Sequence, residues 1–73
     1  MFKNNAEAEK AYYENRNAWI ILADLHAYLV AVKPHQPDPE EFQIEIDDVY
    51  KEMMSHRAAT KAAHKFLGYK PTA

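Results

Sequence analysis

The chain has 73 residues, no cysteine and one glycine, and its formal net charge is −2 at pH 7. A chain of this length removes only about 60 % of its unfolded surface from water, which predicts one small domain with a thin core and no deep substrate pocket. The absence of cysteine excludes disulfides and thiolate metal sites. The near-neutral charge excludes a strong electrostatic field around the whole molecule, so any electrostatic attraction to a partner must arise from local charged patches.

The first element expected is a helix over about residues 6–32, with Asn4 or Asn5 as its cap. Two apolar stripes follow helical spacing along it. The first consists of Ala8, Tyr12, Trp19, Leu22 and Leu29, and the second of Ala11, Ala18, Ile21, Leu25, Tyr28 and Val32. Because more than one face is apolar, the middle of this helix is expected to be wrapped by other segments or partly open to a partner.

A break in this helix is expected, if anywhere, at residues 15–17, where Asn17 can act as a fresh cap. The fold class predicted is therefore all-α, either a helical hairpin or a small three-helix bundle. Strands are disfavoured, although Ile20 and Val30 would suit them, because no turn residue lies between Trp19 and Val32.

The aromatic rings of the first helix are expected mainly in the core. They belong to Tyr12, Tyr13, Trp19 and Tyr28. Adjacent residues on a helix cannot both face inward, however, so Tyr12 or Tyr13 is expected to remain available to a partner.

The apolar stretch over residues 18–32 raises the question of a membrane span. Asp24 and His26 interrupt it, and it is shorter than the roughly 20 residues that a bilayer requires. The preceding residues 1–16 are polar and mixed in charge, unlike a signal peptide. We expect no membrane partner and an intracellular protein.

Three prolines in six positions predict a loop over residues 33–38. A second helix is expected over residues 39–67, because Asp38 can cap it, Pro39 fits its first position and Glu41 follows as in a capping box. Its stripe recurs at spacings of four and three. The stripe contains Phe42, Ile46, Val49, Met53, His56, Thr60, Ala63 and Leu67. Gly68 is expected as a left-handed helix cap before a tail over residues 68–73.

Charge divides along this second helix. From residue 38 to residue 52 there are seven carboxylates against one lysine, whereas no acid follows residue 52. The basic part carries Arg57, Lys61, Lys65 and Lys70, with His56 and His64. The helix dipole accounts for acids in the first turn and bases in the last, but not for acids as far as Glu52. Two explanations of the further acids therefore remain: they form a functional acidic surface, or they are solvated surface charges without a binding role.

Residue spacing argues against catalysis, cofactors and metals. His56 and His64 lie two helical turns, about 12 Å, apart and are expected on the surface, and the neighbouring Asp47 and Asp48 point about 100° apart. Ser55 beside His56 cannot exchange a proton with it along a helix. We therefore expect a macromolecule-binding protein that is not an enzyme.

The residues expected to contact a partner fall into three groups. Acids attract a basic peptide, an aromatic residue anchors it, and cations meet an acidic surface or nucleic acid near the basic carboxyl end. The groups are Glu45, Asp47, Asp48 and Glu52; Tyr12 and Tyr13; and Arg57, Lys61 and Lys65.

The whole chain resembles the small early transcription regulators of lytic phages that infect Xanthomonas. The similarity lies in its length and in the stretches YYENRNAWIILADLH and EIDDVYKEMMSHRAATKAAHKF, residues 12–26 and 45–66. The resemblance implies a cofactor-free helical protein in the cytoplasm of the host bacterium. It implies docking on RNA polymerase at the amino terminus of β′ and near the β flap, which would displace the sigma factor, inhibit initiation and promote read-through of terminators.

A weaker similarity is to the theta subunit of bacterial DNA polymerase III. It rests on the opening MFKN, on the element His56-Arg57-Ala58-Ala59 and on the ending Tyr69-Lys70-Pro71. The neighbourhood of His56 is also similar to nucleoid-associated modulators that bind a larger DNA-binding protein. Each resemblance implies a non-catalytic protein on nucleic-acid machinery. An accessory subunit or a small nucleic-acid-binding helical protein is therefore the alternative.

Overall fold

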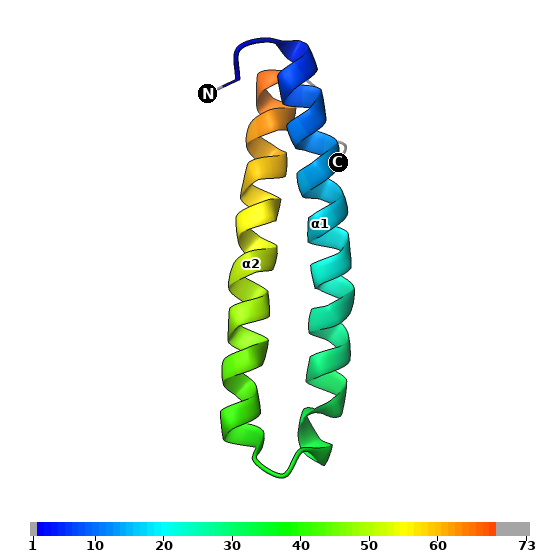
Figure 1. Cartoon of the computed structure of the whole chain (residues 1–73), viewed down its shortest axis with the longest axis vertical. Helices are drawn as coiled ribbons and strands as arrows, with labels where there is room; N and C mark the ends of the chain where they lie inside the picture. Colours follow the sequence, from blue (N-terminus) through cyan, green and yellow to red (C-terminus); the bar gives the residue numbers. More distant parts are fainter. Residues whose placement is uncertain (1, 69–73) are drawn as a thin grey trace.

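The computed structural model describes residues 2–68 and shows an all-α helical hairpin. Helix α1 spans Asn5–Val32, a short 3-10 helix η1 spans Lys33–His35, and helix α2 spans Pro39–Phe66. The two long helices run antiparallel side by side over their full length, so the first and last described residues lie at the same end (Figure 1). The described residues contain no strand.

The helix ends follow the signals in the sequence. The Asn4 side chain accepts a hydrogen bond from the backbone N–H of Glu7 at 2.9 Å, and Asp38 accepts one from the N–H of Glu41 at 3.1 Å. Each bond satisfies a donor that the first turn of a helix leaves without a partner. At the other end of α2, Gly68 has a φ of 75°, the left-handed conformation expected of a glycine cap.

The expected proline loop is partly helical. Pro34 lies in η1, where Gln36 N donates to the Lys33 carbonyl at 3.1 Å, and Gln36 then turns to an extended conformation with a ψ of 146°. Because Pro37 disfavours helical geometry in the residue before it, the chain leaves η1 at this point and reverses direction. The tail that the sequence places after Gly68, with Lys70, lies outside the described residues.

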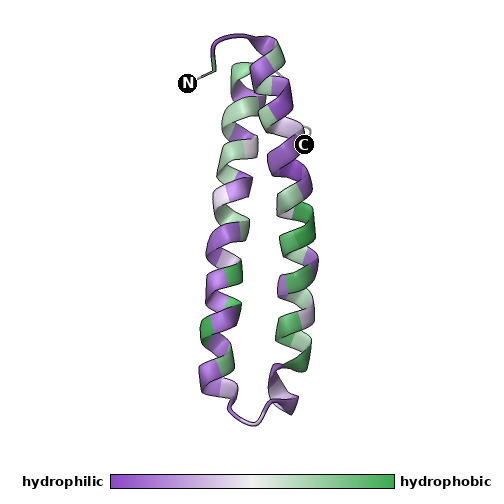
Figure 2. Cartoon of the chain, in the orientation of Figure 1, coloured by the Kyte–Doolittle hydropathy of each residue, from purple (hydrophilic) through white to green (hydrophobic). Residues whose placement is uncertain are grey.

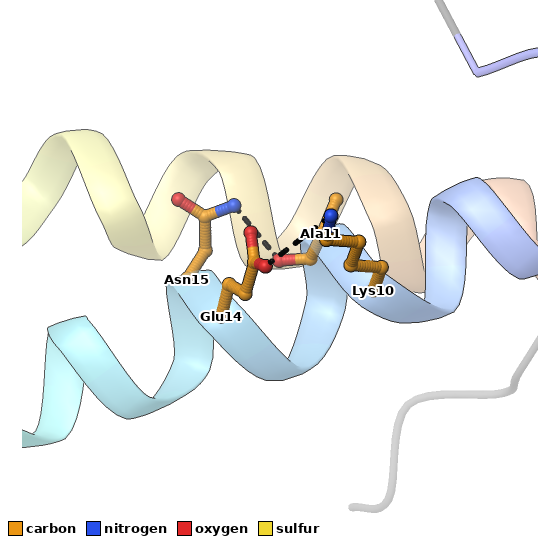
Figure 3. A network of polar contacts seen from close by, with 4 residues as sticks. All are labelled: Lys10, Ala11, Glu14 and Asn15. Atoms are coloured by element: carbon orange, nitrogen blue, oxygen red, sulfur yellow. Dashed lines mark hydrogen bonds and ion pairs between the residues drawn. The ribbon is translucent and has the colours of Figure 1, made fainter.

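The break expected at residues 15–17 is wrong, and so is the three-helix alternative. The Asn15 side chain donates through Nδ2 to the carbonyl oxygen of Ala11 at 2.8 Å, beside the ion pair of Lys10 and Glu14 at 3.9 Å (Figure 3). An asparagine favours a break when its amide competes with the helix for backbone groups. Here the amide bonds to a carbonyl one turn back, and the helix continues.

The hairpin has one interface and a core one layer deep. Its extents are 49 × 25 × 13 Å and its radius of gyration is 15.4 Å, against about 11 Å for a compact domain of this length. Among the described residues only Ala8, Ile46, Thr60 and Ala63 are buried. No helix within residues 2–68 is long and apolar enough to cross a membrane.

Candidate docking surface

Four side-chain pairs link one side of the hairpin at intervals of seven residues. Tyr12 stacks near His64 with ring centroids 5.7 Å apart, the Arg57 guanidinium lies 5.8 Å from the Trp19 ring centroid, and His26 and Tyr50 are 5.6 Å apart. Lys33 Nζ donates to the Gln43 side-chain oxygen. Each step of seven residues forward on α1 matches a step of seven back on α2, the heptad relationship of an antiparallel coiled coil. We call this the ladder side.

A polar pair lies within the interface itself. His56 Nδ1 is 2.8 Å from Asn15 Oδ1, and Thr60 Oγ1 donates to the His56 carbonyl at 2.8 Å. His56 was expected on the surface, but it is half-buried between the helices, as is His64 against Tyr12. Since a histidine has an apolar ring body and polar nitrogens, it can occupy a stripe position once a partner satisfies those nitrogens.

Most of the acids of α2 lie away from the ladder side. Glu41, Glu45, Asp48 and Glu52 follow one another at spacings of four, three and four, and all are exposed. They form one row along the helix, which we call the acid ridge. Asp48 precedes the ladder residue Tyr50 by two positions, about 200° around the helix, so the ridge faces the opposite side of the hairpin.

Asp47 does not belong to this ridge. Its carboxylate accepts a hydrogen bond from Gln43 Nε2 at 2.8 Å, and Gln43 is itself a ladder residue through Lys33. The four acids that the sequence grouped as one surface are therefore divided. Glu45, Asp48 and Glu52 lie on the acid ridge, whereas Asp47 lies on the ladder side; Glu41, which the sequence group omitted, belongs to the ridge.

Three of the six residues in the second apolar stripe of α1 are exposed. Ile21 and Tyr28 retain 67 % and 63 % of their accessible surface, and Leu25 at its edge retains 40 %. Ile21 follows Trp19, and Tyr28 follows His26, by two positions, so both turn away from the ladder side. With Ala18 and Val32, which are half-buried, these residues recur at spacings of three and four, and we call this row the open seam.

The open seam and the acid ridge lie on the same side and in the same half of the molecule. Figure 2 shows that the half of α1 nearer the loop is mainly hydrophobic, while the half of α2 beside it is mainly hydrophilic. At the loop end the ridge meets an open hollow of about 260 Å³. The hollow is lined by Gln36, Pro37, Asp38, Glu41, Phe42 and Glu45. Apolar walls beside carboxylates suit the long apolar stem and cationic head of lysine or arginine.

The aromatic residues differ from the expectation. Tyr12 is half-buried on the ladder side, whereas Tyr13 is 59 % exposed near the terminal end, so one of the two rings is available as predicted. Tyr28 was expected in the core but is exposed beside the acid ridge. Sequence reasoning thus missed Ile21, Leu25 and Tyr28 as candidate docking residues, although the second stripe that contains them was visible.

The basic residues lie apart from the acid ridge. Arg57 is half-buried over Trp19 on the ladder side, while Lys61 and Lys65 are exposed. Lys65 borders an open apolar hollow of about 430 Å³ with Phe2, Ala62 and Phe66. The ring centroids of Phe2 and Phe66 lie 5.4 Å apart there. Acid ridge and basic residues therefore occupy different sides of α2 as well as different ends.

Charge also remains separated along the folded hairpin. Residues 20–52, the half nearer the loop, contain eight carboxylates and two lysines. The described residues of the other half contain six lysines and arginines and three glutamates. Within residues 2–68 the only ion pair is the exposed one between Lys10 and Glu14, so no cation neutralises the acid ridge.

The surface offers binding groups and no assembled metal site. No group of three or more histidine and carboxylate side chains among the described residues is placed to hold a metal ion. Comparison of the chain with protein-family models, curated proteins and solved structures found no match.

Proposed function

We propose that this protein is a phage-encoded regulator that docks on the RNA polymerase of the host bacterium. It inhibits initiation by interfering with the sigma factor, and it promotes read-through of terminators. The observation that carries the proposal is the open seam beside the acid ridge. An exposed apolar row of this kind, edged by charge, is typical of a surface that another protein covers.

The surface fits a partner made of protein better than one made of nucleic acid. The carboxylates of the acid ridge repel phosphates, and Arg57, the first of the three expected cations, is already engaged by Trp19. Large apolar side chains such as Ile21 and Tyr28 contribute to affinity when a protein surface excludes water from them. Of the three expected cations, only Lys61 and Lys65, near the end of the hairpin opposite the loop, are exposed for direct contact with nucleic acid.

The shape supports inhibition by occupation of a surface. A rod 49 Å long can cover a site on a large enzyme without a catalytic step of its own. The resemblance to the phage regulators implies that the site includes the amino terminus of β′ and the region of the β flap. Occupation there prevents the sigma factor from holding promoter complexes, and a protein that stays bound during elongation then alters termination.

The test is purification of the tagged full chain from host lysate, followed by transcription with purified polymerase. We expect RNA polymerase subunits to be retained in stoichiometric amounts, less product from a sigma-dependent promoter, and longer transcripts past a terminator. Absence of binding to both core enzyme and holoenzyme at micromolar concentration would contradict the proposal.

A salt titration separates this proposal from nucleic-acid binding. A protein that binds DNA directly loses affinity steeply as salt rises, even when polymerase is absent. We expect no measurable DNA binding by the isolated chain at physiological salt. Strong, salt-dependent DNA binding without polymerase would instead favour the alternative of a small nucleic-acid-binding protein.

A further inference from the structure

We propose that the open seam and the acid ridge together receive one basic amphipathic helix of the partner, which completes a three-helix bundle. The identity of the partner as RNA polymerase rests on the proposed function. The chemistry of the docking element rests on the geometry of the hairpin alone.

The spacing of the open seam indicates a helix as its occupant. Ala18, Ile21, Leu25, Tyr28 and Val32 recur at intervals of three and four over about 21 Å of helix. On the side of α1 toward α2, Ala8, Asn15, Leu22 and Leu29 recur at intervals of seven, so the interface already has heptad spacing. A row with alternating intervals of three and four is the surface into which the side chains of a second helix pack. One further helix packed on the open seam would give a three-helix bundle.

The acid ridge determines the charge of that helix. Glu45, Asp48 and Glu52 border the seam in the way that flanking positions border the core of a coiled coil, where opposite charges choose the partner. No cation of the described residues is paired with them. The incoming helix is therefore expected to carry lysine or arginine beside its apolar row.

A second copy of this chain fits the surface poorly. A two-fold contact pairs the same patch with itself, so it would bring one acid ridge toward the other. Like charges at close range oppose such a contact. A basic helix relieves this repulsion and covers the same apolar side chains.

The direct test uses two synthetic peptides of about 21 residues, a length that covers the seam with about one turn to spare at each end. Both have leucine at the first and fourth positions of each heptad; one has lysine at the flanking positions and the other has glutamate. Binding of the full chain is measured by fluorescence anisotropy of labelled peptide, and helix formation by circular dichroism. We expect the lysine peptide to bind as a helix, and the glutamate peptide to bind at least about tenfold more weakly.

Neighbouring residues provide matched controls for specific binding at this side. Asp48→Lys and Asp47→Lys change the net charge equally, but only the first alters the acid ridge. We expect Asp48→Lys to lower the affinity for the lysine peptide about fivefold or more relative to Asp47→Lys. Equal effects of the two variants would show attraction by net charge only and would overturn the proposal.

The apolar row has a matched pair of its own. Ile21 and Ile20 are both exposed, at 67 % and 44 %, but Ile20 points about 100° away from Ile21 around the helix. Ile21→Ser is expected to lower the affinity for the lysine peptide about tenfold, and Ile20→Ser less than about twofold. Equal losses would place the peptide elsewhere. Self-association of the unliganded chain that Ile21→Ser abolishes, seen by sedimentation, would overturn the proposal in favour of a second copy.

The same variants keep this inference distinguishable from the proposed function. If the chain binds the lysine peptide as expected but does not bind polymerase, the surface chemistry stands and the proposed function fails. If polymerase binds and Asp48→Lys matters no more than Asp47→Lys, the function stands and the basic helix is overturned.

Discussion

The Nδ1 atom of His56 lies 2.8 Å from the Oδ1 atom of Asn15, across the interface between the two helices. The Asn15 amide nitrogen donates to the Ala11 carbonyl at 2.8 Å, so its oxygen is the acceptor and the His56 ring donates through Nδ1–H. A polar pair between two helices favours one alignment, because another register leaves both groups without these partners.

Removal of either member of this pair should destabilise the hairpin. We expect Asn15→Ala and His56→Ala each to lower the free energy of unfolding by about 1 kcal/mol, and a double-mutant cycle to give a coupling of about 1 kcal/mol. Urea denaturation followed by circular dichroism measures all four proteins. Additive effects would mean that the pair does not act as a unit.

The contact between Arg57 and Trp19 predicts a difference between arginine and lysine. Arg57→Lys keeps the charge but removes the planar group that lies 5.8 Å from the ring centroid. We expect a loss of about 0.5 kcal/mol in stability and a change in the emission of Trp19, the only tryptophan of the chain. Lys61→Ala, one turn further along at an exposed site, is the control and should change neither quantity.

Adjacent residues on α1 should respond differently to the same substitution. Leu22 is half-buried toward α2, whereas Ile21 in the open seam is 67 % exposed. We expect Leu22→Ser to cost about 2 kcal/mol and Ile21→Ser less than about 0.5 kcal/mol, because only the first removes apolar area buried in the hairpin. Thermal unfolding of the isolated chain provides the comparison. A large loss for Ile21→Ser would mean that the seam is already covered in solution.

The cap of α2 predicts a result that depends on hydrogen bonding rather than charge. Asp38 accepts from the Glu41 N–H at 3.1 Å, and asparagine can accept the same bond. Asp38→Ala should lower stability by about 1 kcal/mol, whereas Asp38→Asn should remain within about 0.5 kcal/mol of the original chain. Equal losses in urea denaturation would assign the effect to the negative charge at the helix start instead.

Much of the fold follows from local signals in the sequence. The prolines place the reversal, Asp38 and Asn4 begin the helices, and Gly68 ends the second one, because each acts through its own backbone and nearest neighbours. The continuity of α1 through Asn15 was not predictable in this way. Its amide nitrogen bonds within α1 to Ala11, and its oxygen contacts His56, a partner 41 residues away that the sequence does not indicate.

The candidate docking surface shows the same division. The sequence by itself determined the all-α class, the two stripes of α1 and the order of charges along α2, since helical spacing depends only on position in the chain. Only the tertiary structure decided which stripe α2 covers and which stays open. It also placed Asp47 on the ladder side and Asp48 beside the open seam. The physical reason is that periodicity fixes how residues lie around one helix, whereas the rotation of each helix toward its neighbour is set by the packing of the whole interface.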